Sequence, residues 1–175
     1  MSKTPRIYIK RPIQLLSADF ERRLEPVSKY EKIGPFTLES FKLGEHFSVV
    51  AFRLEGAEKP IQTVINRPQS DYLVHMLNNL GRSEQIIKSP YHHFIALVKD
   101  LGGRIVDLTV TCTRNDMYYG VICAEIGNQI IAEEIPIGDL MVYSTLMLRP
   151  FYMLKEIYEQ ITDDPSPSQT KEDDA

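Results

Sequence analysis

Residues 104–135 read RIVDLTVTCTRNDMYYGVICAEIGNQIIAEEI. Apolar and polar side chains alternate in the first third of this stretch, which is the period of a half-buried strand. Asn115-Asp116 and Gly127-Asn128 are turn signals that divide the stretch in three. The stretch therefore predicts a three-stranded antiparallel meander, with Thr109, Thr111 and Thr113 on its exposed face.

Working outward, FSVVAFRL at 47–54 and PIQTVI at 60–65 predict a hairpin of two strands. Apolar residues at helical spacing from Leu73 to Leu80 predict a helix, and Ser89-Pro90 signals the start of a second one. A helix at 138–148, a short extended piece and a final helix follow the meander. This order predicts an α+β fold with an antiparallel or mixed sheet.

Both ends of the chain differ from this central part. Residues 1–46 are expected to form an N-terminal arm, with a short strand at Arg6 to Lys10, and an irregular extension. Within 13–45, apolar residues at 15–24 indicate one or two amphipathic turns, and proline and glycine break the rest into loops. Residues 47–161 form the predicted domain. Residues 162–175 are an acidic tail, expected to be disordered because it has almost no apolar side chains.

Hydropathy and cysteine content argue against a membrane-spanning protein and a secreted one. The net charge of −4 resides in residues 163–175, which contain five acids and one lysine, so the rest of the chain is close to neutral. No apolar run reaches the ~18–20 residues of a membrane span, and no secretory signal is visible. Cys112 and Cys123 are not expected to face each other, so no disulfide is predicted. These features indicate a cytoplasmic protein without membrane contact.

Several segments, in this order, resemble the bifunctional nuclease domain family. LVKDLGGRIVDLTV at 97–110 is similar to the family's LLEALGGRVVRVVI, and RNDMYYGVICAE at 114–125 is similar to its RDGTFYATLVL hairpin. The similarity runs from about Phe47 to Glu159. It implies a fold of this family and non-specific cleavage of DNA or RNA. The family's Arg-Pro-Ser-Asp-Ala becomes Pro-Ile-Gly-Asp-Leu at 136–140, so only Asp139 is retained.

Asp139, Glu134 and His93 are the candidate catalytic residues. Phosphodiester hydrolysis commonly uses carboxylates that hold a divalent metal such as Mg²⁺, or a general base such as histidine. Asp139 and one of Glu133 and Glu134 lie close enough in sequence to share an ion. The alternative is that Asp139 only caps the helix that it begins.

Arg104, Arg114 and Tyr119 are the candidate nucleic-acid-binding residues. The two arginines bracket the threonines of the first meander strand, and the tyrosine lies across the hairpin. Together they predict a cationic, partly aromatic face for a nucleic-acid backbone. The alternative is an ordinary solvated strand face.

Residues 141–158 are rich in methionine, tyrosine and phenylalanine. Such residues belong to the core or, because interfaces are enriched in them, to a homo-oligomer contact.

The sequence as a whole leaves two functions open. One is a metal-dependent nuclease acting on DNA or RNA, and the other is a non-catalytic oligomeric binding or scaffold protein that kept the fold and lost the active residues.

Overall fold

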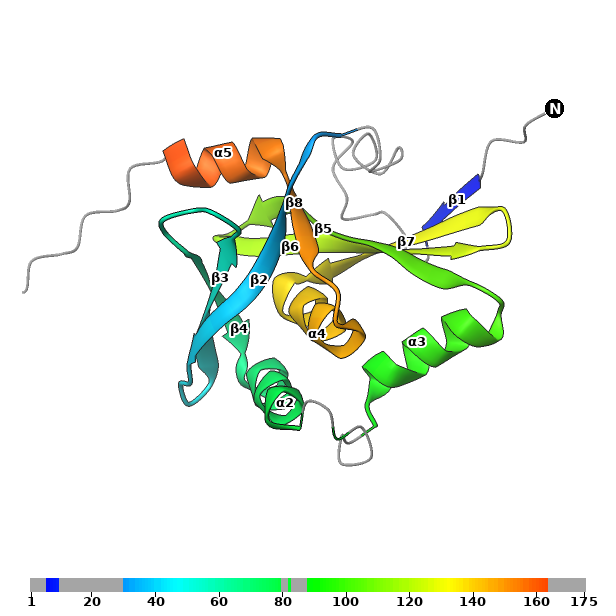
Figure 1. Cartoon of the computed structure of the whole chain (residues 1–175), viewed down its shortest axis with the longest axis horizontal. Helices are drawn as coiled ribbons and strands as arrows, with labels where there is room; N and C mark the ends of the chain where they lie inside the picture. Colours follow the sequence, from blue (N-terminus) through cyan, green and yellow to red (C-terminus); the bar gives the residue numbers. More distant parts are fainter. Residues whose placement is uncertain (1–5, 10–29, 80–81, 83–87, 164–175) are drawn as a thin grey trace, which may run out of the picture.

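The computed structural model describes residues 6–9, 30–79, 82 and 88–163. They form one open mixed sheet of eight strands, together with four helices (Figure 1). In chain order the elements are β1 (Arg6–Ile9), β2 (Lys32–Lys42), β3 (Phe47–Leu54), β4 (Ile61–Asn66), α2 (Arg67–Asn78), α3 (Pro90–Asp100), β5 (Arg104–Arg114), β6 (Met117–Ile126), β7 (Gln129–Pro136), α4 (Ile137–Met147), β8 (Phe151–Leu154) and α5 (Lys155–Asp163). The predicted α+β class with a mixed sheet is confirmed.

The strands lie side by side in the order β1-β7-β6-β5-β8-β2-β3-β4. β1 runs parallel to β7, and β5 runs parallel to β8. All other neighbouring strands are antiparallel. The predicted hairpin and meander thus form the two halves of the sheet, joined through β8 and β2.

The loops predicted across 13–45 are wrong for Lys32–Lys42, which forms β2. This strand pairs with β8 on one side and β3 on the other, so it is an inner strand of the sheet. Its register shifts around Gly34-Pro35 and again between Leu38 and Ser40. These irregularities interrupt the alternation by which a strand is recognised in a sequence. The rest of the predicted arm, at 1–5 and 10–29, and residues 164–175 of the predicted tail lie outside the described residues. Residues 162 and 163, also expected in the disordered tail, belong to α5.

The meander is confirmed, but its first strand is irregular. Asn115 and Asp116 have φ of 49° and 60°, the left-handed pair that a two-residue hairpin turn requires. Bulges interrupt β5 twice along its pairing with β6. Leu108, Thr109, Val110 and Thr111 are all buried, so both faces of this part of β5 are covered, and the prediction that the two threonines lie on an exposed face is wrong. Val106, expected inside, is 41% exposed.

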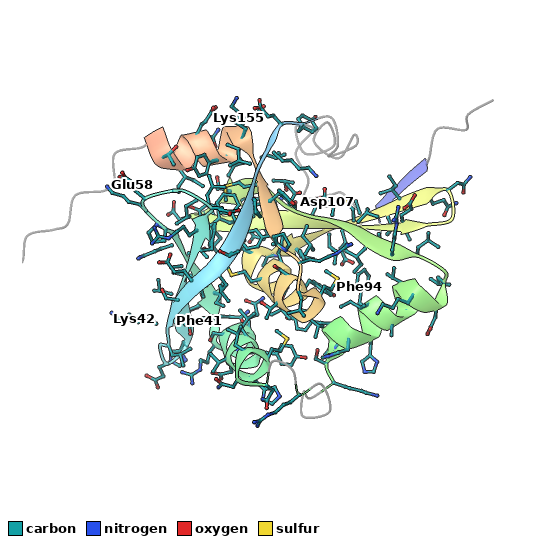
Figure 2. All side chains as sticks on the ribbon, viewed as in Figure 1. Phe41, Lys42, Glu58, Phe94, Asp107 and Lys155 are labelled. Atoms are coloured by element: carbon teal, nitrogen blue, oxygen red, sulfur yellow. The ribbon has the colours of Figure 1, made fainter. Side chains whose placement is uncertain are left out.

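Helices cover both faces of the sheet. Figure 1 shows α4 below the central strands and α5 above them. The backbone of Gly120 on β6 packs directly against α4, since a Cβ there would stand 2.3 Å from Leu140 Cδ1 and 2.7 Å from the carbonyl oxygen of Thr109. Beside α4 lie α2 and α3, and Phe94 of α3, labelled in Figure 2, packs edge-on against Tyr143 of α4 at 5.6 Å between ring centroids. No helix among the described residues is both long and apolar enough to cross a membrane.

One continuous core joins the two halves of the sheet. At its centre the rings of Phe36, Phe52 and Phe151 lie within 5.4–5.7 Å of one another. Met141, Tyr143, Phe151 and Met153 are all buried, so much of the aromatic and methionine content of residues 141–158 is core. Both cysteines are free thiols, and burial raises the pKa of Cys123 to about 12.

Candidate functional site

The residues predicted to act together lie in three separate places. Glu134 is on β7, Asp139 is in the first turn of α4, and His93 is on α3. Among the described residues, no group of three or more His, Cys, Asp or Glu side chains is arranged to hold a metal ion. A metal ion shared by Asp139 and Glu134 would therefore have no third ligand from these side chains.

Arg114, Glu134 and Tyr119 form the first group, on the meander. The Arg114 guanidinium donates to the Glu134 carboxylate in an ion pair and stands 4.8 Å from the centre of the Tyr119 ring. It also donates to Cys112 Sγ at 3.5 Å. The side chains of Arg114 and Glu134 are only 37% and 16% exposed, so a phosphate has little access to this cation, and the group is best explained as a cross-strand stabilising contact.

Asp139 is the centre of the second group, between α2, α3 and α4. Its Oδ1 accepts hydrogen bonds from Gln69 Nε2 and from the Tyr91 hydroxyl, both at 2.6 Å. Burial, and then the bond to Asp139, raise the pKa of Tyr91 well above its ordinary value, so this hydroxyl keeps its proton and donates. Pro136, not Asp139, is the N-cap of α4; Asp139 lies in the first turn, where the helix dipole favours a carboxylate, but its side chain does not cap the helix. Instead, Asp139 ties three helices together.

Gly138 makes room for this arrangement. A Cβ at position 138 would lie 2.1 Å from Gln69 Oε1 and 2.6 Å from Gln69 Cδ. Gln69 itself is only 9% exposed. The side chain of Gln69 thus fills the space that a side chain at position 138 would occupy, and from there it donates to Asp139.

A pair of tyrosines connects Asp139 to His92. The rings of Tyr91 and Tyr72 stack with centroids 5.7 Å apart, and the Tyr72 hydroxyl lies 3.1 Å from His92 Nδ1. The backbone N–H of Ser89 also donates to His92 Nδ1, at 3.2 Å. An atom that accepts from a backbone N–H carries no proton, so neutral His92 has its proton on Nε2. Burial, and then His93 and Lys88, lower the pKa of His92, which favours this neutral form.

The third place is a groove of about 740 Å³ between α3, the start of β5 and the end of α4. Four of its lining side chains are lysine or arginine and two are histidine, and none of the described residues that line it is acidic. The predicted residues His93 and Arg104 are both among them. The lining comprises Lys88, His92, His93, Ile95, Ala96, Val98, Lys99, Gly103, Arg104, Ile105, Leu146, Met147 and Arg149.

The cations of the groove differ in how they are held. Arg149 Nη1 donates to the carbonyl oxygen of Ile105 at 2.7 Å, which ties the end of α4 to β5. Arg104 Nε donates to Glu125 at 2.9 Å, but the arginine side chain is 77% exposed. Lys88 and Lys99 are exposed. Most of the positive charge is thus accessible to an anion that enters the groove.

A comparison with protein-family models finds no match, and a search of curated proteins finds no similar sequence. The assignment of a function therefore depends on the three groups described above. Gln69 and Tyr91, which donate to Asp139, and Tyr72, which stacks on Tyr91, were not among the predicted site residues.

Proposed function

We propose that the protein binds nucleic acid through the cationic groove. The observation that carries this proposal is the collection of four lysine and arginine side chains and two histidines in one groove, with no acid among its described lining residues. Outside the acidic tail the chain is close to neutral, so this density of positive charge is local. Neutralisation of phosphates by lysine and arginine is the principal source of affinity in most complexes with nucleic acid.

Binding is the part of the predicted function that the geometry supports best. The carboxylates expected to hold a metal are distributed over β7 and α4, and both Asp139 and Glu134 already accept hydrogen bonds. The groove needs none of them to attract phosphates. As far as the predicted metal site is concerned, the proposal therefore favours a binding protein over a metal-dependent nuclease.

Hydrolysis in the groove is the second function that we propose to test, in line with the resemblance to bifunctional nucleases. Its support is His92, whose neutral form has its proton on Nε2 and which lines the groove. Such a group can donate a hydrogen bond to a phosphate oxygen, and an exposed neighbour, His93, can take the proton of the water that attacks the phosphorus as the P–O bond to the leaving strand breaks.

The test measures fluorescence anisotropy of labelled DNA and RNA with the wild-type protein and two double variants. Lys99→Gln/Arg104→Gln removes two cations from the groove. Lys42→Gln/Lys59→Gln removes two exposed cations from β2 and from the turn before β4, and serves as the matched control. We expect only the first variant to weaken binding. Equal loss in both, or no binding by the wild type, would contradict the proposal.

Cleavage of the same labelled strands, with Mg²⁺ or with EDTA, tests the second function. His93→Gln is compared with Asp139→Asn, which keeps an acceptor for Tyr91 and Gln69. Cleavage lost in His93→Gln and retained in Asp139→Asn would place hydrolysis in the groove. Intact strands at saturating wild-type protein would leave binding as the function.

A homo-oligomer is a further proposal, supported by the outer face of the β3–β4 hairpin. Phe47 is 63% exposed and Val64 is 47% exposed, and β4 is an edge strand of the described sheet. An edge strand with exposed apolar side chains favours pairing with another chain. Light scattering gives the mass in solution, and Val64→Lys should convert an oligomer to a monomer if this edge forms the contact.

A further inference from the structure

The floor of the groove differs chemically from its rim. Ile95, Leu146 and Met147 line it, and all three are only partly buried, so a ligand can reach them. Val98 and Ile105, below them, belong to the core at 3% and 6% exposure. A ligand that contacted only the cations would leave the accessible apolar floor in water. The lining therefore fits a ligand with both anionic groups and flat apolar surface.

A second hollow of about 250 Å³ continues the groove past the end of α4. The two share Ile105, Met147 and Arg149 in their linings, so they meet at these residues. The second hollow adds Asp107, whose carboxylate is ion-paired with Lys32, and the side chain of Tyr152. The Tyr152 ring packs over Gly34, since a Cβ on Gly34 would stand 2.4 Å from Tyr152 Cδ1. The ring is thus held in place, and aromatic rings of this kind are where unpaired bases stack.

We propose, on the basis of the nucleic-acid binding put forward above, that the groove takes single-stranded nucleic acid and contacts its unpaired bases. The phosphates lie along the lysine and arginine rim. One base packs against Leu146 and Met147, and a neighbouring base lies at Tyr152. Methionine suits this role because its flexible, polarisable side chain makes favourable contacts with aromatic rings.

Duplex nucleic acid cannot use the same surface. In a duplex the bases are stacked inside and the phosphates lie outside, so only phosphates reach the rim. The floor and Tyr152 then contribute nothing. A single strand exposes the faces of its bases and engages both parts of the lining, which predicts a preference for single strands that depends on the bases themselves.

Three labelled probes of equal length separate the two contributions: a single strand, the corresponding duplex, and a single strand with abasic sites. The abasic strand keeps every phosphate and loses the bases. We expect the wild type to bind the ordinary strand at least about fivefold more tightly than the abasic one, the factor that corresponds to the lower end of the energy of stacking one base.

Met147→Gln tests the floor, and Leu97→Gln is its matched control. Leu97 is 48% exposed on α3 and is not among the residues that line the groove. We expect Met147→Gln to reduce binding of the ordinary strand toward that of the abasic strand, with binding of the abasic strand unchanged, and Leu97→Gln to have no effect. Thermal unfolding of both variants verifies their fold, and the comparison of probes on the wild type needs no variant.

Two outcomes would overturn this inference while nucleic-acid binding stands. One is equal affinity for all three probes, which would mean that only phosphates are contacted. The other is equal loss of strand binding in Met147→Gln and Leu97→Gln. Absence of binding to every probe would overturn the proposed function itself. Met147-dependent binding to phosphatidylserine vesicles, without binding to any strand, would mean that the apolar floor accommodates lipid.

Discussion

Salt dependence gives the sharpest test of the cationic groove, because its magnitude follows from the number of charges. Four lysine and arginine side chains line the groove. If each neutralises one phosphate of a single strand, the logarithm of the association constant falls with that of the salt concentration with a slope of about −2.8, at about 0.7 per phosphate. The affinity then drops about 50-fold between about 50 and about 200 mM salt.

Lys99→Gln/Arg104→Gln halves the number of these charges. We expect its slope to be about −1.4 and its affinity to drop only about sevenfold over the same range. Anisotropy titrations at several KCl concentrations give both slopes directly. The control Lys42→Gln/Lys59→Gln lowers the net charge equally but removes no charge from the groove, so its slope should equal that of the wild type.

Arg104 adds a complication that one further variant resolves. Its guanidinium is paired with Glu125, so removing the arginine also leaves a carboxylate without its partner near the groove. Glu125→Gln keeps all four cations and removes this carboxylate, and we expect it to bind the strand more tightly than the wild type. A slope of Lys99→Gln/Arg104→Gln equal to that of the wild type would refute the assignment of the phosphates to this groove.

Three predictions concern stability. Gly120→Ala should lower the free energy of unfolding by about 1–3 kcal/mol in a urea titration, because its Cβ meets Leu140 and a backbone oxygen; an unchanged midpoint would contradict the close packing of α4 on β6. Asp139→Ala should lower it by about 1–3 kcal/mol, and Asp139→Asn by less, since only alanine leaves Tyr91 and Gln69 without an acceptor; equal losses would contradict this role. Burial lowers the pKa of His92 below 6.5, so the folded state binds fewer protons than the unfolded state and stability should fall as the pH drops below that value. His92→Asn should flatten this decrease in urea midpoints measured across the pH range, and an unaltered slope would exclude His92 as its source.

Local signals explain which elements could be predicted. The meander is marked by its turn residues and its alternation, and α2 and α3 by helical spacing and by proline at or near their first residues. β2 has no such signal, because its register shifts twice where it meets its neighbours. The bulges in β5 likewise arise from its pairing with β6, and Thr109 and Thr111 are buried because other elements cover the second face of the strand as well as the first. Pairing between distant segments is not encoded in the period of one strand.

The hydrogen-bond partners of Asp139 could not be predicted from local sequence patterns for the same reason. Gln69 is 70 residues away in sequence and Tyr91 is 48 residues away. One signal was nevertheless present: at helical spacing Gln69 falls on the same face as Leu73 and Met76, and a polar side chain on a buried face needs a partner. The spacing predicts an inward glutamine, but only the packing of α2 against α4 identifies the carboxylate that it binds.

The glycine at position 138 determines what the neighbouring aspartate does. Gly138 leaves a space that Gln69 fills, and Gln69 in turn occupies an oxygen of Asp139 together with Tyr91. A carboxylate with two strong donors has a structural reason to be retained that requires no catalysis. Loss of activity in Asp139→Ala would therefore not identify a catalytic group, because the same change loosens α2 and α3 and with them the wall of the groove that holds His92. Only Asp139→Asn, which preserves the contacts and removes the charge, separates the two roles.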